Sequence, residues 1–269
     1  MQRVTDNPGK RTPGIDPVLW ESPEKQAAAR GTLRQQGSPA QPLRRVWMPQ
    51  AHGQRRPLGM ATMWDRAMPT VSLRALDPMA DTTGERHSSG FRPARCTAEA
   101  IEPCRLLLSR TTSAQWLLEA DMPSCCAAIS HDGLVAHIPL ETPILRQWLQ
   151  AGCRTQGAWH PTDAGTPPGG PAAPVLGHLT WDGGETRRKR EPLPTRQRHA
   201  GFINLVRWAD DGLITGRTHE VLDQEVTPRV EGLLQERGLR LSAETTRSTP
   251  IAPGIDFLGH HSRKYRGKC

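Results

Sequence analysis

The segment GFINLVRWADDGLITG, residues 201–216, constrains the fold more than any other part of the chain. Two short apolar runs flank a pair of acids and a glycine, which is the pattern of a tight β-hairpin with Asp210 and Asp211 at its tip. An acidic pair followed by glycine is also an ordinary turn, so this hairpin alone says little about chemistry. A third acid beside it would turn the pair into a candidate site.

That third acid ends another apolar run, QWLLEAD, which covers residues 115–121. Pro123 follows at once, so the run predicts a strand with Asp121 at its end. A sheet that pairs this strand with the hairpin would bring Asp121, Asp210 and Asp211 together. Clustered carboxylates suit phosphoryl transfer, because the divalent ions of that reaction prefer hard oxygen ligands. The spacing permits such a site without requiring it.

Capping residues mark two helices. Ser22 suits the N-cap of a helix that Gly37 can stop, and Thr227 suits the N-cap of another that ends at Gly238. The residues that follow, LRLS at 239–242, have the composition of a strand. Because helices and strands mix without strict alternation, the sequence predicts an α+β fold.

Two prolines lie where the composition otherwise favours helix. Pro103 falls within residues 97–110, where an interior proline costs about 3 kcal/mol, so that helix is expected to be kinked or broken. Pro69 interrupts a second probable helix. Residues 43–62 instead alternate apolar and basic residues, which predicts a hairpin that packs on one face and points its arginines outward.

The size and composition allow a buried core. The chain has 269 residues, enough for one large domain or two modest ones. Hydrophobic residues make up 36% and aromatic residues 4%, while glycine and proline number 25 each. The core is therefore expected to be aliphatic, interrupted by turns and poorly cohesive.

Basic residues exceed acidic ones, and the formal net charge is +8 at pH 7. Since each Lys or Arg that faces a phosphate releases condensed counterions, this charge favours a polyanionic partner, and nucleic acid is the natural candidate. Roughly half of the basic runs are expected to be ordinary solvated surface. The runs lie at residues 44–45, 55–56, 187–190 and 263–268.

The cysteines and the N-terminus predict a cytoplasmic protein with reduced thiols. The six cysteines show no paired C-x-x-C spacing, and no apolar signal stretch opens the chain. Cys125, Cys126 and His131 could be read as a zinc cluster, but adjacent cysteines without a second pair rarely complete a tetrahedral site. No apolar run approaches the roughly 20 residues that span a bilayer, so no membrane partner is expected.

Matching strings run in order through nearly the whole chain, and together they resemble the reverse transcriptases of group II introns. They look like the family's opening motif, fingers hairpin and following segment, then its first aspartate strand, nucleotide-side loop, aspartate hairpin and closing palm motifs. A chance match of so many ordered strings is negligible. The strings are NPGKRTPGID (7–16), RRVWMPQAHGQRRPLGMATMWDRAM (44–68), SSGFRPAR (88–95), WLLEADMPSCCAAISH (116–131), GTPPGG (165–170), WADD (208–211), ERGLRLSAETT (236–246) and GIDFLGHHSRKYRGK (254–268).

The resemblance implies roles for individual residues. Asp121, Asp210 and Asp211 match the acids of metal binding and catalysis, with Asp211 the least direct ligand. The resemblance also implies Mg²⁺ as the cofactor.

Other matched residues would contact substrate. Arg56 matches the arginine that faces the phosphates of the incoming nucleotide, a role suited to a planar, permanently charged fork. Gly169 and Gly170 match the loop that lets backbone approach nucleotide and template, although a plain loop remains an alternative. Trp208 stands where the family has the tyrosine of its aspartate hairpin.

Several departures from the family's pattern fall at sites of function. Gln54 stands where a phosphate-facing lysine is expected, and Pro168 where a glutamine is, which removes an amide side chain and a backbone donor. Cys126 replaces the aromatic beneath the sugar, and Ala127 replaces an aspartate. Trp208 is bulkier than tyrosine and would crowd the primer end. The sequence therefore predicts a degenerate site around an intact acidic centre.

Taken together, the sequence and the resemblance predict a right-hand polymerase fold of the α+β class, with fingers in residues 1–115, a palm in residues 116–269 and the thumb missing. The implied reaction is RNA-directed DNA synthesis by two-metal phosphoryl transfer. The implied partners are an RNA template, in this family intron RNA, a DNA primer and dNTPs. Two alternatives stay open: a non-catalytic remnant that binds intron RNA, and a relic without a stable fold.

Overall fold

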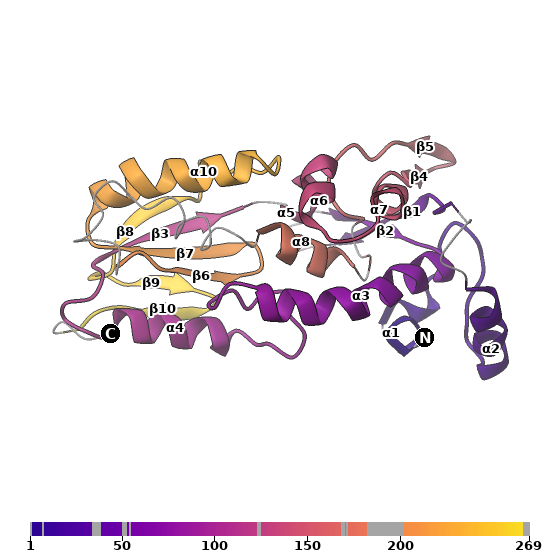
Figure 1. Ribbon diagram of the computed structural model, residues 1–269, viewed down its shortest axis with the longest axis horizontal. Coiled ribbons are helices and arrows are strands. Elements are labelled where there is room, and N and C mark those ends of the chain that lie inside the picture. Colours follow the sequence, from indigo (N-terminus) through magenta and orange to yellow (C-terminus); the bar gives the residue numbers. More distant parts are fainter. Residues whose placement is uncertain are drawn as a thin grey trace. The chain divides into compact units, whose positions relative to one another are not determined.

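The computed structural model describes residues 2–6, 8–33, 39–49, 53, 55–122, 125–167, 170, 172–181 and 202–265. They form two compact units, each assembled from two separate stretches of chain: Met1–Met79 with Cys126–Gly177, and Ala80–Cys125 with His178–Cys269. Helices and sheets occur in both, so the fold is α+β as predicted (Figure 1). The division into fingers over residues 1–115 and a palm over residues 116–269 remains a prediction.

A four-stranded sheet organises the first unit, with the strand order β2-β1-β4-β5. The first two strands pair antiparallel, which confirms the hairpin expected over residues 43–62, while β1 and β4 pair in parallel. The strands are β1 (Leu43–Pro49), β2 (Arg55–Met60), β4 (Cys153–Thr155) and β5 (Ala158–His160).

The helices of the first unit include the one that the capping signal predicted. The Ser22 hydroxyl accepts a hydrogen bond from the Lys25 amide at 3.3 Å, and Pro23 opens α2. This helix ends at Thr32, and Gly37 lies outside the described residues. Helical segments that lie wholly or mainly in this unit are α1 (Gln2–Thr5), η1 (Pro8–Arg11), α2 (Pro23–Thr32), α3 (Met63–Thr83), α5 (Cys125–Ala128), α6 (His131–His137), α7 (Thr142–Leu149) and α8 (Ala173–Trp181).

Two arginines of the first hairpin turn toward protein instead of solvent. Arg44 donates from Nε and Nη2 to the Pro13 carbonyl at 3.1 and 2.8 Å, and Arg45 donates to the Cys153 sulfur at 2.9 Å. The expectation that these arginines point outward to phosphate is therefore wrong. Arg44 thus ties a distant stretch of backbone to the hairpin, and Arg45 ties a distant side chain to it, since a half-buried charge needs hydrogen-bond partners.

The second unit is built on a four-stranded sheet with the order β6-β7-β3-β8 (Figure 1). The inner strand β3 pairs antiparallel with β7 on one side and β8 on the other. The predicted strand that ends at Asp121 and the predicted hairpin around the acidic pair are both confirmed. The strands are β3 (Trp116–Asp121), β6 (Leu205–Trp208), β7 (Asp211–Gly216) and β8 (Arg247–Pro250), with a separate hairpin of β9 (Ile255–Phe257) and β10 (His260–Ser262).

Strand β3 is buried on both faces. Leu117 lies in one apolar cluster with residues of β7, β6 and α4 (Ala98–Leu108), whereas Leu118 lies in another with residues of η4 (Val221–Val226). This explains why its sequence is a continuous apolar run instead of an alternating one. The inner strand is thus held in place from two sides.

The prolines do not break the helices in which they lie. Helix α3 runs through Pro69 and Pro78, and α4 runs through Pro103. The expectation of interrupted or broken helices is therefore wrong. Packing of apolar side chains such as Leu108 offsets the hydrogen bond that each proline removes.

Two predictions near the C-terminal end of the second unit are also wrong. Thr227 has helical dihedral angles and does not cap a helix, because a π-helical turn, η4, leads directly into α10 (Thr227–Gln235). None of residues 239–242, all of which are described, lies in a strand. Instead the Ser242 amide donates to the Asp121 carbonyl at 2.9 Å, at the end of β3.

Across the described parts of the chain, every helix is too short or too polar to cross a membrane.

A pair of leucines on α4 tests the core of the second unit. Leu108 is fully buried, whereas Leu106 is 58% exposed. Leu108→Ala is expected to lower the free energy of unfolding by about 2–5 kcal/mol, because it leaves a cavity beside β3. Leu106→Ala makes the same chemical change on the same helix and should stay within about 0.5 kcal/mol of the parent protein. Urea denaturation measures both, and equal losses would contradict the assigned core.

Candidate active site

Two of the three predicted acids face each other across neighbouring strands. Asp121, the last residue of β3, is paired in register with Asp211, the first residue of β7. Residues directly opposite in an antiparallel pair have Cβ atoms about 4.5–5.5 Å apart, so both carboxylates lie on one face of the sheet. Burial, and after it the negative charge of Asp121, raises the pKa of Asp211 above its ordinary value. The two charges therefore repel each other in the folded protein.

Asp121 is held in place by two residues that lie far from it along the chain. The Thr245 hydroxyl donates to its Oδ2 at 2.7 Å, and the Ser242 amide donates to its main-chain carbonyl at 2.9 Å. Both donors belong to the ERGLRLSAETT string, to which the sequence assigned no role at the site. Its place among the ordered family strings was the only available signal.

Asp210 occupies the loop of the aspartate hairpin. Trp208 pairs with Asp211, so the loop has two residues, Ala209 and Asp210. Ala209 has φ +53. A positive φ at the first loop position is typical of type II′ turns, where glycine is favoured and an L side chain costs roughly 1–2 kcal/mol. Asp210 is half-buried, and its Oδ1 is shielded from solvent.

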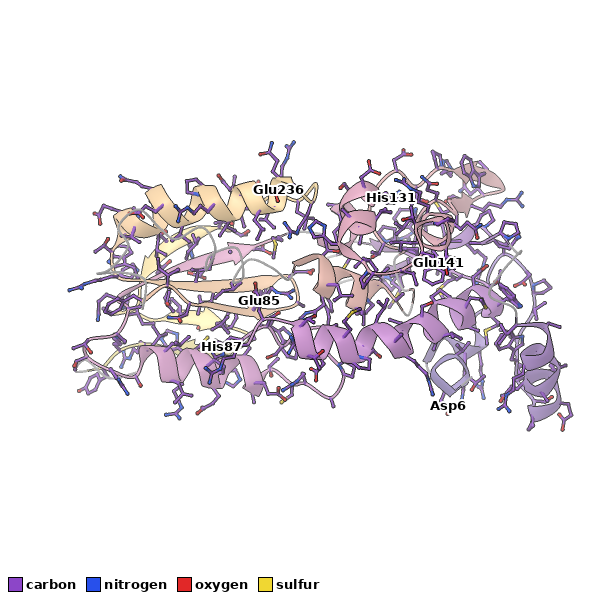
Figure 2. All side chains as sticks on the ribbon, in the orientation of Figure 1. Asp6, Glu85, His87, His131, Glu141 and Glu236 are labelled. Atoms are coloured by element: carbon purple, nitrogen blue, oxygen red, sulfur yellow. The ribbon has the colours of Figure 1, made fainter. Side chains whose placement is uncertain are left out.

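The segment before Phe91 supports this loop. The Arg207 amide donates to the His87 carbonyl at 2.9 Å, and the Ser89 amide donates to the Arg207 carbonyl at 3.0 Å. A Cβ added to Gly90 would lie 1.8 Å from the backbone nitrogen of Ala209, so only glycine fits there. Figure 2 labels the side chain of His87 at the start of this segment. The SSGFRPAR string therefore acts as a backbone support for the acidic loop.

Trp208 contributes to the core as well as to the hairpin. Its half-buried side chain packs against the apolar cluster that contains Leu117 and Leu213. Those leucines share a sheet face with the paired acids, since residues two apart along a strand point the same way. On this face of the sheet, the strands therefore carry the acids at one end and apolar core residues farther along.

The remaining predicted residues belong to the first unit. Arg56 lies on β2 opposite Met48, and its side chain is outside the described part of the structure. The Gly170 amide donates to the Pro167 carbonyl at 3.0 Å. Gly169 lies outside the described residues, as do Gln54 and Pro168.

The facing carboxylates fit a hard divalent cation, because a positive charge between them would relieve their repulsion. Among the residues that the structure describes, no group of three or more His, Cys, Asp or Glu side chains is arranged to hold a metal ion. The sequence predicts that all three acids come together. In the structure Asp121 and Asp211 face each other, and Asp210 is their neighbour in the loop.

Comparison with known proteins places the chain in a family. Residues 48–262 match the family described as reverse transcriptase (RNA-dependent DNA polymerase). Protein YkfC of Escherichia coli K12 is 24% identical in an alignment of 307 positions, and the alignment covers 99% of this chain and 80% of YkfC. The group II intron-encoded protein LtrA of Lactococcus lactis is 28% identical over 187 residues, 66% of this chain but only 31% of LtrA.

Solved structures share the fold. A telomerase structure from Candida albicans superposes with a TM-score of 0.61 at 13% identity. The superposition covers 86% of this chain and 46% of the telomerase chain. Apo telomerase from Candida tropicalis gives a TM-score of 0.60 at 13% identity, with 88% and 50% covered. With the family match extending over most of its length and an intron-encoded relative beside it, the chain belongs to the reverse transcriptase family, in its group II intron type.

Proposed function

We propose that this chain carries out RNA-directed DNA synthesis, extending a DNA primer with dNTPs at a site formed by Asp121, Asp210 and Asp211. The observation that carries the proposal is the in-register pairing of Asp121 with Asp211, close enough for one charge to raise the pKa of the other. Like charges held together at a sheet end cost stability, and such costs concentrate at functional sites. Membership of the family supports this reaction over other phosphoryl transfers.

Asp121, Asp210 and Asp211 would hold a divalent ion, Mg²⁺ in this proposal. The pairing with Asp121 favours a direct role for Asp211, in place of the least direct role that the resemblance implies. When bound, the ion supplies positive charge that activates the primer 3′-hydroxyl and stabilises the leaving pyrophosphate. The chain's own part is to orient the ligands. Thr245 fixes one oxygen of Asp121, which leaves its other oxygen available toward Asp211.

The proposed partners follow from charge and resemblance. The net charge of +8 suits an RNA template, and the intron-encoded relative suggests that this template is intron RNA. We assign Arg56 to the phosphates of the dNTP, and Gly169 and Gly170 to the close approach of nucleotide and template. Trp208 would lie next to the primer end through its place beside Asp211.

A non-catalytic RNA-binding remnant is the second candidate. It is favoured by the departures from the family's pattern at positions 54 and 168, where glutamine and proline replace the expected lysine and glutamine. Such a remnant needs only the positive surface, and its binding would fall steeply with salt.

Primer extension on an RNA template separates the two candidates. The parent protein should extend the primer, and Asp210→Ala should lose at least about a hundredfold in rate, because a charged group of the reaction centre is removed. Asp256→Ala, which removes an exposed acid of β9 in the same unit, should keep parental activity. Null activity in the parent and both variants would sink the enzyme proposal and favour the remnant.

Divalent ions should stabilise the folded protein through the facing acids. Addition of Mg²⁺ is expected to raise the melting temperature of the parent protein, because the ion binds the native site and not the unfolded chain. Asp121→Asn should remove most of this rise, whereas Asp256→Asn should keep it. The measurement is a thermal melt with and without Mg²⁺. A rise of the same size in all three proteins would mean that the ion binds elsewhere.

The burial of Asp211 and its repulsion by Asp121 together predict a dependence of stability on pH. Because the pKa of Asp211 is raised in the folded state, this carboxyl destabilises the fold at neutral pH, and the cost disappears as the pH falls below its ordinary pKa, about 4. Asp211→Asn should therefore melt at a higher temperature than the parent at pH 7, and the difference should shrink toward zero at about pH 4. A difference that does not change with pH would argue against a raised pKa of Asp211 in the folded protein.

A further inference from the structure

A buried arginine lies directly behind the aspartate hairpin. Arg207 precedes Trp208 in β6 and is only 1% exposed, which makes it one of the largest fully buried side chains of the described residues. A guanidinium is expensive to bury unless its N–H groups are hydrogen-bonded. The sequence offers no reason for a charge at this position, since β6 is otherwise an apolar strand.

The guanidinium reaches the loop that carries Asp210. Its Nη1 donates to the Ala209 carbonyl at 3.3 Å, across the turn whose first residue has φ +53. The Arg207 main chain also bonds to the 87–89 segment on both its N–H and its carbonyl. One residue thus contacts the strained loop through its side chain and the supporting segment through its backbone.

A second set of contacts holds this guanidinium in place. His178, on α8 and 1% exposed, has Nδ1 at 2.8 Å from Nη2 of Arg207, and its Nε2 lies 3.0 Å from Nε of Arg92. Burial first, and then the charges of Arg207 and Arg92, lower the pKa of His178 from 6.5 to about 3, so the ring is neutral at physiological pH. A neutral imidazole has one acceptor nitrogen and one N–H, so the ring accepts from only one guanidinium at a time.

The backbone of Gly90 closes the network. It forms a hydrogen bond with His178, and its Cα lies so close to Ala209 that no side chain fits between them. The loop before Asp210 is therefore enclosed by the Arg207 guanidinium and by Gly90. The His178 imidazole contacts both of these residues. A strained backbone conformation persists only where several surrounding contacts hold it in place. The contacts of Arg207 and Gly90 do this for Ala209.

We propose that Arg207 is a positioning residue, which together with His178 fixes the Ala209–Asp210 loop so that the acidic pair points at the reacting phosphates. The role rests on the proposed function, because it concerns the geometry of the same acids. Arg207 is only 1% exposed and contacts the loop by a hydrogen bond. Its effect is carried through the Ala209 carbonyl.

The test compares two buried arginines of the same unit. Arg237 is 4% exposed and donates to the carbonyls of Thr180 and Leu233, without a described contact to the hairpin. Arg207→Met and Arg237→Met remove equivalent buried charges, so both should lower the melting temperature. Only Arg207→Met is expected to lower kcat per folded molecule, by about tenfold to a hundredfold, with KM for dNTP and Kd for primer–template within about twofold of the parent.

A conservative variant adds a second readout. Arg207→Lys keeps the charge but loses the fork that spans Ala209 and His178, so it should fold better than Arg207→Met and recover only part of kcat. If Arg207→Met does not fold, the lysine variant alone is compared with Arg237→Lys. Equal kcat losses at positions 207 and 237, or full activity in the position-207 variant, would overturn the positioning role.

Amide hydrogen exchange keeps this inference separate from the proposed function. If the parent protein shows no primer extension, the proposed function fails, but loop positioning is still measurable. The amides of residues 209–211 should exchange about tenfold faster in Arg207→Met than in Arg237→Met, because the loop loses its side-chain partner. Equal exchange rates in the two variants would overturn the positioning role whether or not the parent is active.

Discussion

The antiparallel pairing of β3 with β7 is the interaction on which the rest of the second unit depends. Its register is set by apolar residues, because Leu117 and Leu118 are buried on opposite faces and a shift by one residue would exchange them. The same register brings Asp121 opposite Asp211. A hydrophobic pattern in the middle of the strands therefore decides the positions of charges at their end.

That arrangement lets the fold hold groups that destabilise it. Two facing carboxylates repel each other, and Ala209 adopts a backbone conformation that favours glycine. Core packing around β3 supplies the stabilisation that offsets these local costs. Gly90 and the buried Arg207 then leave the loop little room to relax. A site of this kind is expected where geometry matters more than local stability.

Local sequence patterns predict the elements that carry the acids. A continuous apolar run ending in acid predicts β3, and two apolar runs around an acidic pair predict the hairpin. Where tertiary contacts decide the structure, the local pattern is misleading. Residues 239–242 have strand composition, yet Ser242 bonds to the end of β3 and no strand forms there. Thr227 resembles a helix cap, but the chain is already helical when it reaches that residue.

Local patterns in the sequence are enough to predict the α+β class, the strand and the hairpin that carry the three acids and, through the ordered strings, the family. Only the tertiary structure decided that Asp211 faces Asp121, that Thr245 orients Asp121, and that Arg207 is buried behind the loop. The reason is physical: strand and turn preferences act between near neighbours in the chain, whereas the partner of a carboxylate or a buried guanidinium comes from segments brought together when the core forms.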